Sequence, residues 1–411
     1  MKKLLLSLFF LATTALVHAN DIQLANTSLS GQNTTAHTVL INFDVTWKNS
    51  WRTSTNEANY DGAWIFVKYR KLNTSNWQHC TLNTAGFTAP SGSTIKVSAD
   101  QKGLWIYRSS NGIGDVNYTG GKVVWNYGSN GVLDTDSCEI RVYAVEMAYV
   151  PQGSFYLGSG GTEYYGFTDS TSSSPYQITS ENALNYGTTN GQIYSSAAGA
   201  GYTIPANFPK GYAAFWCMKY ECSQQQYADF LNSLDLLRSN ANNPGIFSGT
   251  HPNLIAPNPE RAMGNVGTGS LMAWMDWAAM RPMSEMEYEK ACRGANITPI
   301  PNEYAWGSTS ATGITTINNA GTSTESFNAA ANVNANSGVN RMVRCGGFAT
   351  DLTASNREAS GATYYGIMEM TGNGWERVIR LVNTPTVLLF NRTTHGDGNL
   401  AATGASDVTI W

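Results

Sequence analysis

The six cysteines are the residues of this chain that could most readily carry redox chemistry or bind a soft metal. Cys217 and Cys222 form the closest pair, with the spacing Cys-x4-Cys. The surrounding pattern predicts a strand residue followed by a helix-cap residue. Such positions need not converge, and no third ligand lies nearby in the sequence. A structural role is therefore the favoured interpretation of this pair. The remaining thiols are Cys80, Cys138, Cys292 and Cys345.

The other side chains give no support to several classes of enzyme. The five histidines are scattered, so no His-x-x-His or Glu-His pair stands at the spacing of a zinc site. The sequence contains neither a Gly-x-Ser-x-Gly elbow nor a phosphate-binding Gly-x-x-x-x-Gly-Lys loop. Zinc hydrolase, serine hydrolase and nucleotide-binding functions are therefore set aside.

The segment Gly372-Asn-Gly-Trp-Glu376 is suited to a different chemistry. Its carboxylate follows closely on backbone carbonyls that the glycines leave accessible. Calcium prefers six or more such oxygens in a flexible arrangement. The alternative is a glycine turn with Trp375 in the core, and the residues alone leave both open.

A short helix should position the residues that follow Arg281. Ser284 and Glu287 form a capping box, in which each side chain can accept a hydrogen bond from the other residue's backbone N–H. Gly294 can take the left-handed position that ends the helix. The residues expected on its inner face are Tyr288, Ala291 and Cys292.

Two further helices are predicted. Ser223 and Gln226 repeat the capping-box pattern, and residues 271–280 place two tryptophans on one face. Residues 158–205 are rich in Ser, Thr, Gly, Tyr and Asn without periodicity, which favours a surface insertion lacking a strand pair or helix. Residues 294–364 read mostly as turns, and residues 387–390 as a fragment of strand.

Residues 20–145 read as strands. Apolar and polar residues alternate over residues 39–47, which is the period of a half-buried strand. Further runs occur at 63–69, 104–107, 123–126 and 139–147, so we expect an antiparallel β-sandwich. Cys80 and Cys138 are the only cysteines in this region, and a disulfide between them is predicted.

Composition and the first residues point to an exported protein. Charged residues make up 13 % of the chain, about half the usual share, which suits a loop-rich and strand-rich protein. The net charge is 25 − 29 = −4 and forms no basic run, so nucleic acid and a polybasic membrane patch are not expected as partners. Lys2-Lys3, an apolar run over 4–17 and Ala19 predict a signal peptide at residues 1–19, and hence a periplasmic, cell-surface or secreted location. No later apolar run is long enough for a membrane span.

Two blocks of the sequence resemble one known family. Residues 281–294 are similar to the Arg-Leu-Pro-Thr-Glu-x-Glu-Trp-Glu-x-Ala-x-Arg-Gly signature of the formylglycine-generating, sulfatase-modifying-factor family. Residues 365–376 resemble its Gly-Leu-x-Asp-Met-x-Gly-Asn-x-Trp-Glu-Trp block. Weaker matches lie at 150–159, 218–223 and 303–307, so the resemblance covers roughly 146–411.

The resemblance implies an architecture and a set of site residues. It implies an α+β domain of the C-type-lectin-like sort over 146–411, with much irregular structure, after the sandwich at 20–145. It implies a calcium site with the ligands Glu369, Gly372, Gly374 and Glu376, where both glycines bind through their carbonyls. A second site is tentatively matched to Asn319 and Ala320, and Trp375 would form a wall on the substrate side.

The resemblance also implies an activity, the oxidation of a sulfatase cysteine to formylglycine with oxygen and copper. The family's copper-binding cysteines follow an Arg-Gly-Gly-Ser-Trp strand. No such segment follows Glu376, so we expect the C-terminal part of the domain to be missing. The alternative is a non-catalytic, calcium-stabilised surface protein that binds a protein or glycan partner. The low charge, the insertion, the added sandwich and the missing segment favour this alternative, and copper is expected only if the chain is catalytic.

Overall fold

The computed structural model describes residues 21–170, 172–196, 201–335, 339, 341–349 and 357–411. The predicted signal peptide, residues 1–19, lies outside these ranges. Within them the chain is strand-rich with six short α-helices, which confirms the predicted α+β class. None of the described helices combines the length and hydropathy that a membrane span requires.

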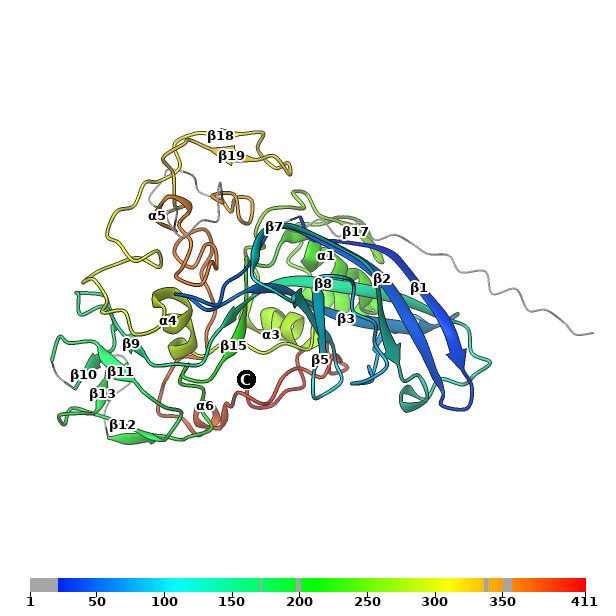
Figure 1. Ribbon diagram of the computed structural model, residues 1–411, viewed down its shortest axis with the longest axis horizontal. Coiled ribbons are helices and arrows are strands. Elements are labelled where there is room, and N and C mark those ends of the chain that lie inside the picture. The colour runs from blue at the N-terminus through cyan, green and yellow to red at the C-terminus, as the bar shows by residue number, and fades with distance from the viewer. Residues whose placement is uncertain (1–20, 171, 197–200, 336–338, 340, 350–356) are drawn as a thin grey trace, which may run out of the picture.

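Two antiparallel sheets form the centre of the molecule (Figure 1). The first has the strand order β15 (Phe215–Met218), β8 (Cys138–Val150), β3 (Asp61–Lys71), β6 (Leu104–Arg108) and β5 (Ser93–Val97), with β4 (Gln78–His79) also paired to β3. We call it the main sheet. The second has the order β1 (Gln23–Asn33), β2 (Thr38–Arg52) and β7 (Gly112–Trp125). Every strand run predicted from the sequence before residue 150 overlaps one of these strands, and only the last residue of the run at 123–126 lies beyond its strand, β7.

The two sheets share one apolar core. Alternate residues of β2 are buried, as the period of two predicts, and they form one cluster with side chains of β3, β5, β6 and β7. The strand β3 is buried on both faces. Ile65 and Val67 point into this shared core, while Trp64 and Phe66 belong to a second cluster on the opposite face.

Helices cover that opposite face of the main sheet. Tyr227, Phe230 and Leu231 come from α1 (Gln224–Ser233), and Trp274 and Trp277 come from α3 (Thr268–Trp277). Both helices lie where the sequence predicts them. The other helices are α2 (Leu236–Asn242), α4 (Glu285–Arg293), α5 (Arg357–Ser360) and α6 (Pro385–Leu389).

The main sheet crosses the predicted boundary at residues 145 and 146. That boundary lies inside β8, and β15 pairs with β8 from the C-terminal side, with Cys217 opposite Ala148. The N-terminal region and the C-terminal region therefore share one hydrogen-bonded sheet.

The predicted insertion contains strands of its own, so the expectation of a segment without strand pairs is wrong. Its strands are β10 (Thr168–Asp169), β11 (Tyr176–Ile178), β12 (Leu184–Tyr186), β13 (Ile193–Tyr194) and β14 (Tyr202–Ile204). They follow β9 (Phe155–Leu157) and bury a cluster that includes Phe167, Ile178 and Met286 of α4. Figure 1 shows this lobe beside α4, at the opposite end from the long hairpin of β1 and β2.

Two local expectations need correction. Residues 387–390 are not strand, because Thr384 accepts a hydrogen bond from the Val387 N–H and Pro385 begins the helix α6. All six cysteines are free, so the predicted bond between Cys80 and Cys138 is absent. The Cys80 N–H donates to the Val67 carbonyl on one side of β3, and Cys138 of β8 lies opposite Lys71 on the other side. Val67 and Lys71 are four residues apart along β3. A disulfide needs much closer Cα atoms than these positions provide.

The remaining elements are short. They are the 3-10 turn η1 (Gly128–Asn130) and the hairpins β16 (Ser248–Thr250) with β17 (Asn253–Ile255) and β18 (Ile317–Asn318) with β19 (Ser326–Phe327). The C-terminal segment is fixed by Asp276 of α3, whose carboxylate accepts hydrogen bonds from the Asp397 N–H, the Asp407 N–H and the Ser406 hydroxyl. Asp276, Asp397 and Asp407 thus lie close together.

Candidate functional site

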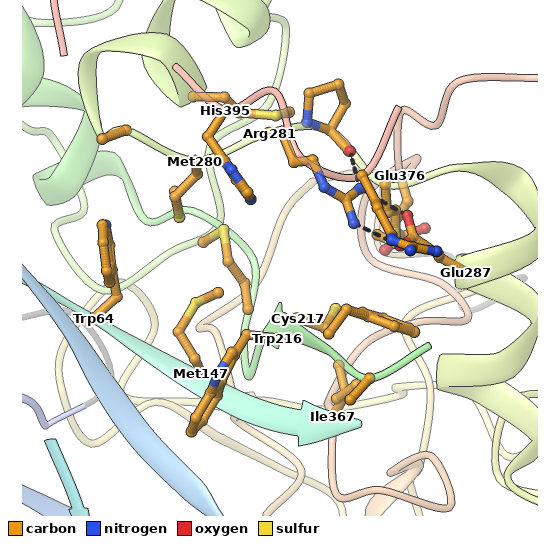
Figure 2. A pocket seen from close by; sticks show the side chains of 18 of the residues that line it. Trp64, Met147, Trp216, Cys217, Met280, Arg281, Glu287, Ile367, Glu376 and His395 are labelled. Atoms are coloured by element: carbon orange, nitrogen blue, oxygen red, sulfur yellow. Dashed lines mark hydrogen bonds and ion pairs between the residues drawn. The ribbon is translucent and has the colours of Figure 1, made fainter. Parts of the chain in front are cut away.

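A cavity of about 410 Å³ lies beside the main sheet. The segment after α3 and the second signature block, residues 365–376, form much of its other side. Its walls are unusually rich in thioethers. Seven of the twelve methionines of the chain line it: Met147, Met218, Met275, Met280, Met283, Met368 and Met370. Figure 2 shows Trp64, Met147 and Trp216 on one side, Met280 and His395 opposite, and Arg281, Glu287 and Glu376 at the far end.

One wall is a row of three indoles. Trp105 of β6 and Trp216 of β15 stack with ring centroids 4.3 Å apart and planes at 7°. Trp64 of β3 continues the row at 4.7 Å from Trp105. The Trp64 ring is held in place because its Nε1–H donates to the Ala278 carbonyl at 2.9 Å. Two of the three indoles come from the N-terminal region.

The far end of the cavity is held by the cap of α4. Arg281 donates to both carboxylate oxygens of Glu287, at 2.8 and 2.6 Å. One of those oxygens also accepts from the Ser284 N–H at 2.9 Å, while the Ser284 hydroxyl accepts from the Glu287 N–H at 3.1 Å. The predicted capping box is confirmed. It fixes an ion pair at the cavity wall, in which the charge of Arg281 is already neutralised.

The helix α4 ends before Gly294 as predicted, but this glycine has ψ of −172° and is not in the predicted left-handed conformation. Gly294 has φ of +92°, and a Cβ there would lie 2.3 Å from Cγ of Tyr364. Only glycine fits this close approach.

Two further carboxylates line the cavity without a cation beside them. Glu221 accepts hydrogen bonds from the Gly374 N–H at 2.8 Å and from the Asn373 amide. Burial raises the pKa of Glu221 to about 7, against the effect of these donors. Burial and the neighbouring Glu221 raise the pKa of Glu376 to about 8. Through its hydrogen bonds to Asn373 and Gly374, Glu221 holds the second signature block against the segment before α1.

The thiols of the C-terminal region are neutral. Cys217 lines the cavity, and burial raises its pKa to about 12. Burial also raises the pKa of Cys222, Cys292 and Cys345 well above the ordinary value. These four cysteines are distributed over three different apolar clusters. None of them is placed in the electropositive, exposed setting of a reactive thiolate.

The predicted calcium residues are partly brought together. Glu369 is buried, and one of its oxygens accepts from the Gly346 N–H at 2.8 Å while the other has no hydrogen-bond partner among the described residues. Such an orphaned oxygen fits a cation ligand. Gly372 and Gly374 lie in the same loop, and Glu376 is close enough to raise the pKa of Glu369, after burial and Glu221.

The other predicted site residues lie elsewhere. Asn319 and Ala320 are exposed in the turn between β18 and β19, where the Asn319 carbonyl accepts from the Thr322 N–H and hydroxyl. Trp375 has 89 % of its surface exposed and is not among the cavity-lining residues. It points to solvent because the loop turns its neighbour Glu376 inward.

Sequence reasoning missed the methionines, the indoles and Glu221. The methionines are spread from residue 147 to residue 370 and follow no local period, so no sequence signal brings them together. Glu221 lies inside the weak match at 218–223, which was the one available hint.

Comparison with known proteins gives one family. The model of the sulfatase-modifying factor enzyme 1-like domain matches residues 141–397, which are 257 of the 411 residues. No curated protein and no solved structure matches the chain. The matched region contains the α4 cap, the loop at 369–376 and most of the cavity wall, and it makes up more than half of the chain. The chain therefore belongs to the sulfatase-modifying factor family.

Proposed function

We propose that this chain is a non-catalytic binding member of its family, and that its cavity takes a ligand with an apolar body. The observation that carries the proposal is the lining of seven methionines and three tryptophans around about 410 Å³. Binding cavities are mostly apolar with a few placed polar groups. Methionine is common where a surface adapts to its ligand, because the side chain is flexible and polarizable.

The composition of the wall supports an apolar ligand over a glycan. A thioether is a poor hydrogen-bond acceptor, so the methionine wall could not satisfy the hydroxyl groups of a sugar. At the α4 end of the cavity, Arg281 and Glu287 already satisfy each other. An apolar portion of a small molecule or of a protein partner fits this distribution.

Family membership favours a second candidate, the oxidation of a cysteine to formylglycine. Copper(I) for that reaction needs soft thiolates held together. The four thiols of the C-terminal region do not fit this need, because burial keeps each of them neutral and they are divided among three apolar clusters. This contrast supports the binding proposal over the enzyme.

We also propose that the chain binds calcium, is exported and contains a β-sandwich. Calcium would be held by Glu369 and Glu376 with the carbonyls of Gly372 and Gly374, and the orphaned oxygen of Glu369 supports this set. The ion would supply positive charge to a loop that carries buried carboxylates. Export rests on the first 19 residues of the sequence. The shared core of the two N-terminal sheets supports the β-sandwich, joined to a C-type-lectin-like domain through β8.

The experiment measures binding of the neutral naphthalene dye prodan, whose emission shifts to the blue in an apolar site. Ala214 is exposed and lines the cavity, so Ala214→Trp should block the cavity without disturbing the core. Ala311→Trp places the same indole at an exposed position outside the cavity lining and serves as the control.

We expect saturable binding of one dye per chain, weakened about tenfold or more by Ala214→Trp and unchanged by the control. Absence of saturable binding, or equal binding by both variants, would contradict the proposal.

A further inference from the structure

The indole row is a ready surface for a cation. The face of an indole carries negative potential, and a cation within about 6 Å of its centroid is attracted to it. Trp64, Trp105 and Trp216 all line the cavity. Within the described part of the chain no lysine or arginine lies over any of these three rings.

The same aromatic cluster shows this chemistry at its other end. Trp216 contacts Tyr60 at 5.4 Å and Tyr107 at 6.1 Å. The Arg52 guanidinium lies over Tyr60 at 4.7 Å and over Tyr107 at 5.6 Å. The cluster therefore carries a cation of the chain at the end away from the cavity, while no lysine or arginine of the described residues lies over its rings at the cavity end.

One acidic side chain of the lining, Asp100, is available to a cation at the indole end. Two of its three arginines have acidic partners, since Arg281 pairs with Glu287 and Arg392 lies 3.9 Å from Glu181. The remaining charged side chains of the lining are Asp100, Glu221, Glu376 and Arg377, with His395. Asp100 lies in the loop between β5 and β6 that leads to Trp105, and its carboxylate accepts only the Lys102 N–H among the contacts of the described residues.

From this arrangement we propose that the indole end of the cavity binds an alkylammonium group, with Asp100 and the ring of Trp64 facing the charge, Trp105 packed against that ring, and the methionines facing the alkyl chain. The inference rests on the proposed function and names the class of its ligand. All three of these residues come from the N-terminal region, so this region determines specificity for a cavity of the family domain. A small amine and a lysine side chain share this chemistry.

The test compares three probes of equal chain length: hexyltrimethylammonium, 1-hexanol and hexanoate. Displacement of prodan reports the affinity of each. We expect the ammonium to bind about tenfold or more tightly than the alcohol, and hexanoate to bind more weakly than both. Alcohol binding without an ammonium preference would overturn this inference and leave the proposed function standing. Loss of binding by all three probes would overturn both.

Two variants identify the residues. Trp105→Leu keeps an apolar side chain and removes the ring, and Asp100→Asn removes the charge at an exposed position. Asp100→Asn should weaken ammonium binding about threefold to tenfold and change hexanol binding less than twofold, while Trp105→Leu should weaken ammonium binding more than it weakens hexanol binding. Glu358→Gln, an exposed acid outside the cavity lining, is the control for charge and should change neither. Equal losses for ammonium and hexanol would show a packing role only and contradict the inference.

The source of the ammonium is decided with two peptides, Ac-Ala-Lys-Ala-NH₂ and its norleucine analogue. A lysine preference shows that the mouth admits a peptide backbone and extends the inference to a protein partner. Binding of hexyltrimethylammonium with no binding of either peptide restricts it to small amines.

Discussion

Lys219 is the residue that ties the N-terminal region to the family domain. Its Nζ donates to Asp61 of β3 and to Glu146 of β8, both at 3.0 Å, and all three side chains are buried. Asp61 also accepts from the Trp47 Nε1–H and the Ser50 hydroxyl of β2. Burial raises the pKa of Glu146 to about 8, although Lys219 opposes the rise. Lys219 is thus the cation that both buried carboxylates contact.

Replacing Lys219 should therefore be costly. Lys219→Met leaves two buried carboxylates without their cation, and we expect the free energy of unfolding to fall by about 3–5 kcal/mol. Lys48→Met breaks the exposed pair with Asp21 at 3.4 Å and should cost less than about 1 kcal/mol. Urea unfolding of both variants measures the difference. Equal effects would show that the buried group does not hold the two regions together.

Lys68 gives a pH dependence of known sign. The side chain is fully buried, and its ammonium donates to the Gly398 carbonyl. Burial lowers the pKa of Lys68 to about 7, although Asp276 and Asp397 act in the opposite direction. The unfolded chain should have the ordinary value near 10.4. Between about pH 7 and 10 the unfolded state then binds more protons at this residue, so stability due to Lys68 rises with pH.

Lys68→Met should remove that rise. The difference in the free energy of unfolding between wild type and variant should shift by about 3 kcal/mol in favour of the wild type from pH 7 to pH 9.5. Lys48→Met, at an exposed position, should show no such shift. Urea unfolding at both pH values is the measurement, and parallel curves for wild type and Lys68→Met would contradict it.

Among contacts between single residues, the sequence predicts those that are local. The Ser284 and Glu287 side chains bond as expected because the two residues stand three apart and the helix itself fixes their geometry. Glu221 and Gly374 stand 153 positions apart, and no local rule could pair them. The exposure of Trp375 was not predictable for the same reason, because it depends on how its loop is held by the distant Glu221.

The loop at residues 369–376 is the element on which calcium should act. It carries the buried Glu369, whose second oxygen lacks a hydrogen-bond partner among the described residues, and the partly buried Glu376. Calcium binding to these carboxylates would stabilise the native state only. We expect the melting temperature to rise by several degrees when calcium replaces a chelator, on the order of what a few kcal/mol gives a chain of this size.

The control separates the site from general ionic effects. Glu376→Gln should abolish the rise, while Glu358→Gln on α5 should retain it. A wild-type melting curve that is the same with calcium and with chelator would remove the site.

The elements themselves were predictable where their patterns are long. The alternation of β2 extends over most of its fifteen residues, and α1 and α4 begin with complete capping boxes. The strands β10 to β14 have two or three residues each, which is too short for any period. Their core residues are isolated among glycine and serine, so only tertiary packing defines them. The helix α6 was missed because its apolar run resembles a strand unless Thr384 and Pro385 are weighed first.

For the whole molecule, the shared main sheet means that the two predicted domains are joined by backbone hydrogen bonds. The cavity takes Trp64 and Trp105 from one side of the predicted boundary and most of its methionines from the other. Family signatures identify the C-terminal part from sequence because they are local blocks. The cavity is a product of how the sheet joins both parts, and a single sequence does not contain that information in any local pattern.

The activity of the whole chain can be tested against its family. Incubation with copper, oxygen and a peptide that contains Cys-x-Pro-x-Arg should leave the peptide mass unchanged, because no described thiol is poised as a copper ligand. Time-dependent conversion of the peptide thiol to an aldehyde, lost in Cys217→Ser, would contradict this expectation. Prodan binding by Cys217→Ser should remain, since a serine keeps the size of that cavity position.

The central claim, that a ligand with an apolar body enters the methionine cavity, is tested most directly by NMR of the protein labelled with ¹³C at the methionine methyl groups. Seven methionines line the cavity, while Met263, Met272, Met286 and Met342 do not. Saturating prodan should shift the signals of the cavity methionines and leave those four signals in place. Shifts confined to the other four, or no saturable shift in the cavity set, would contradict the account.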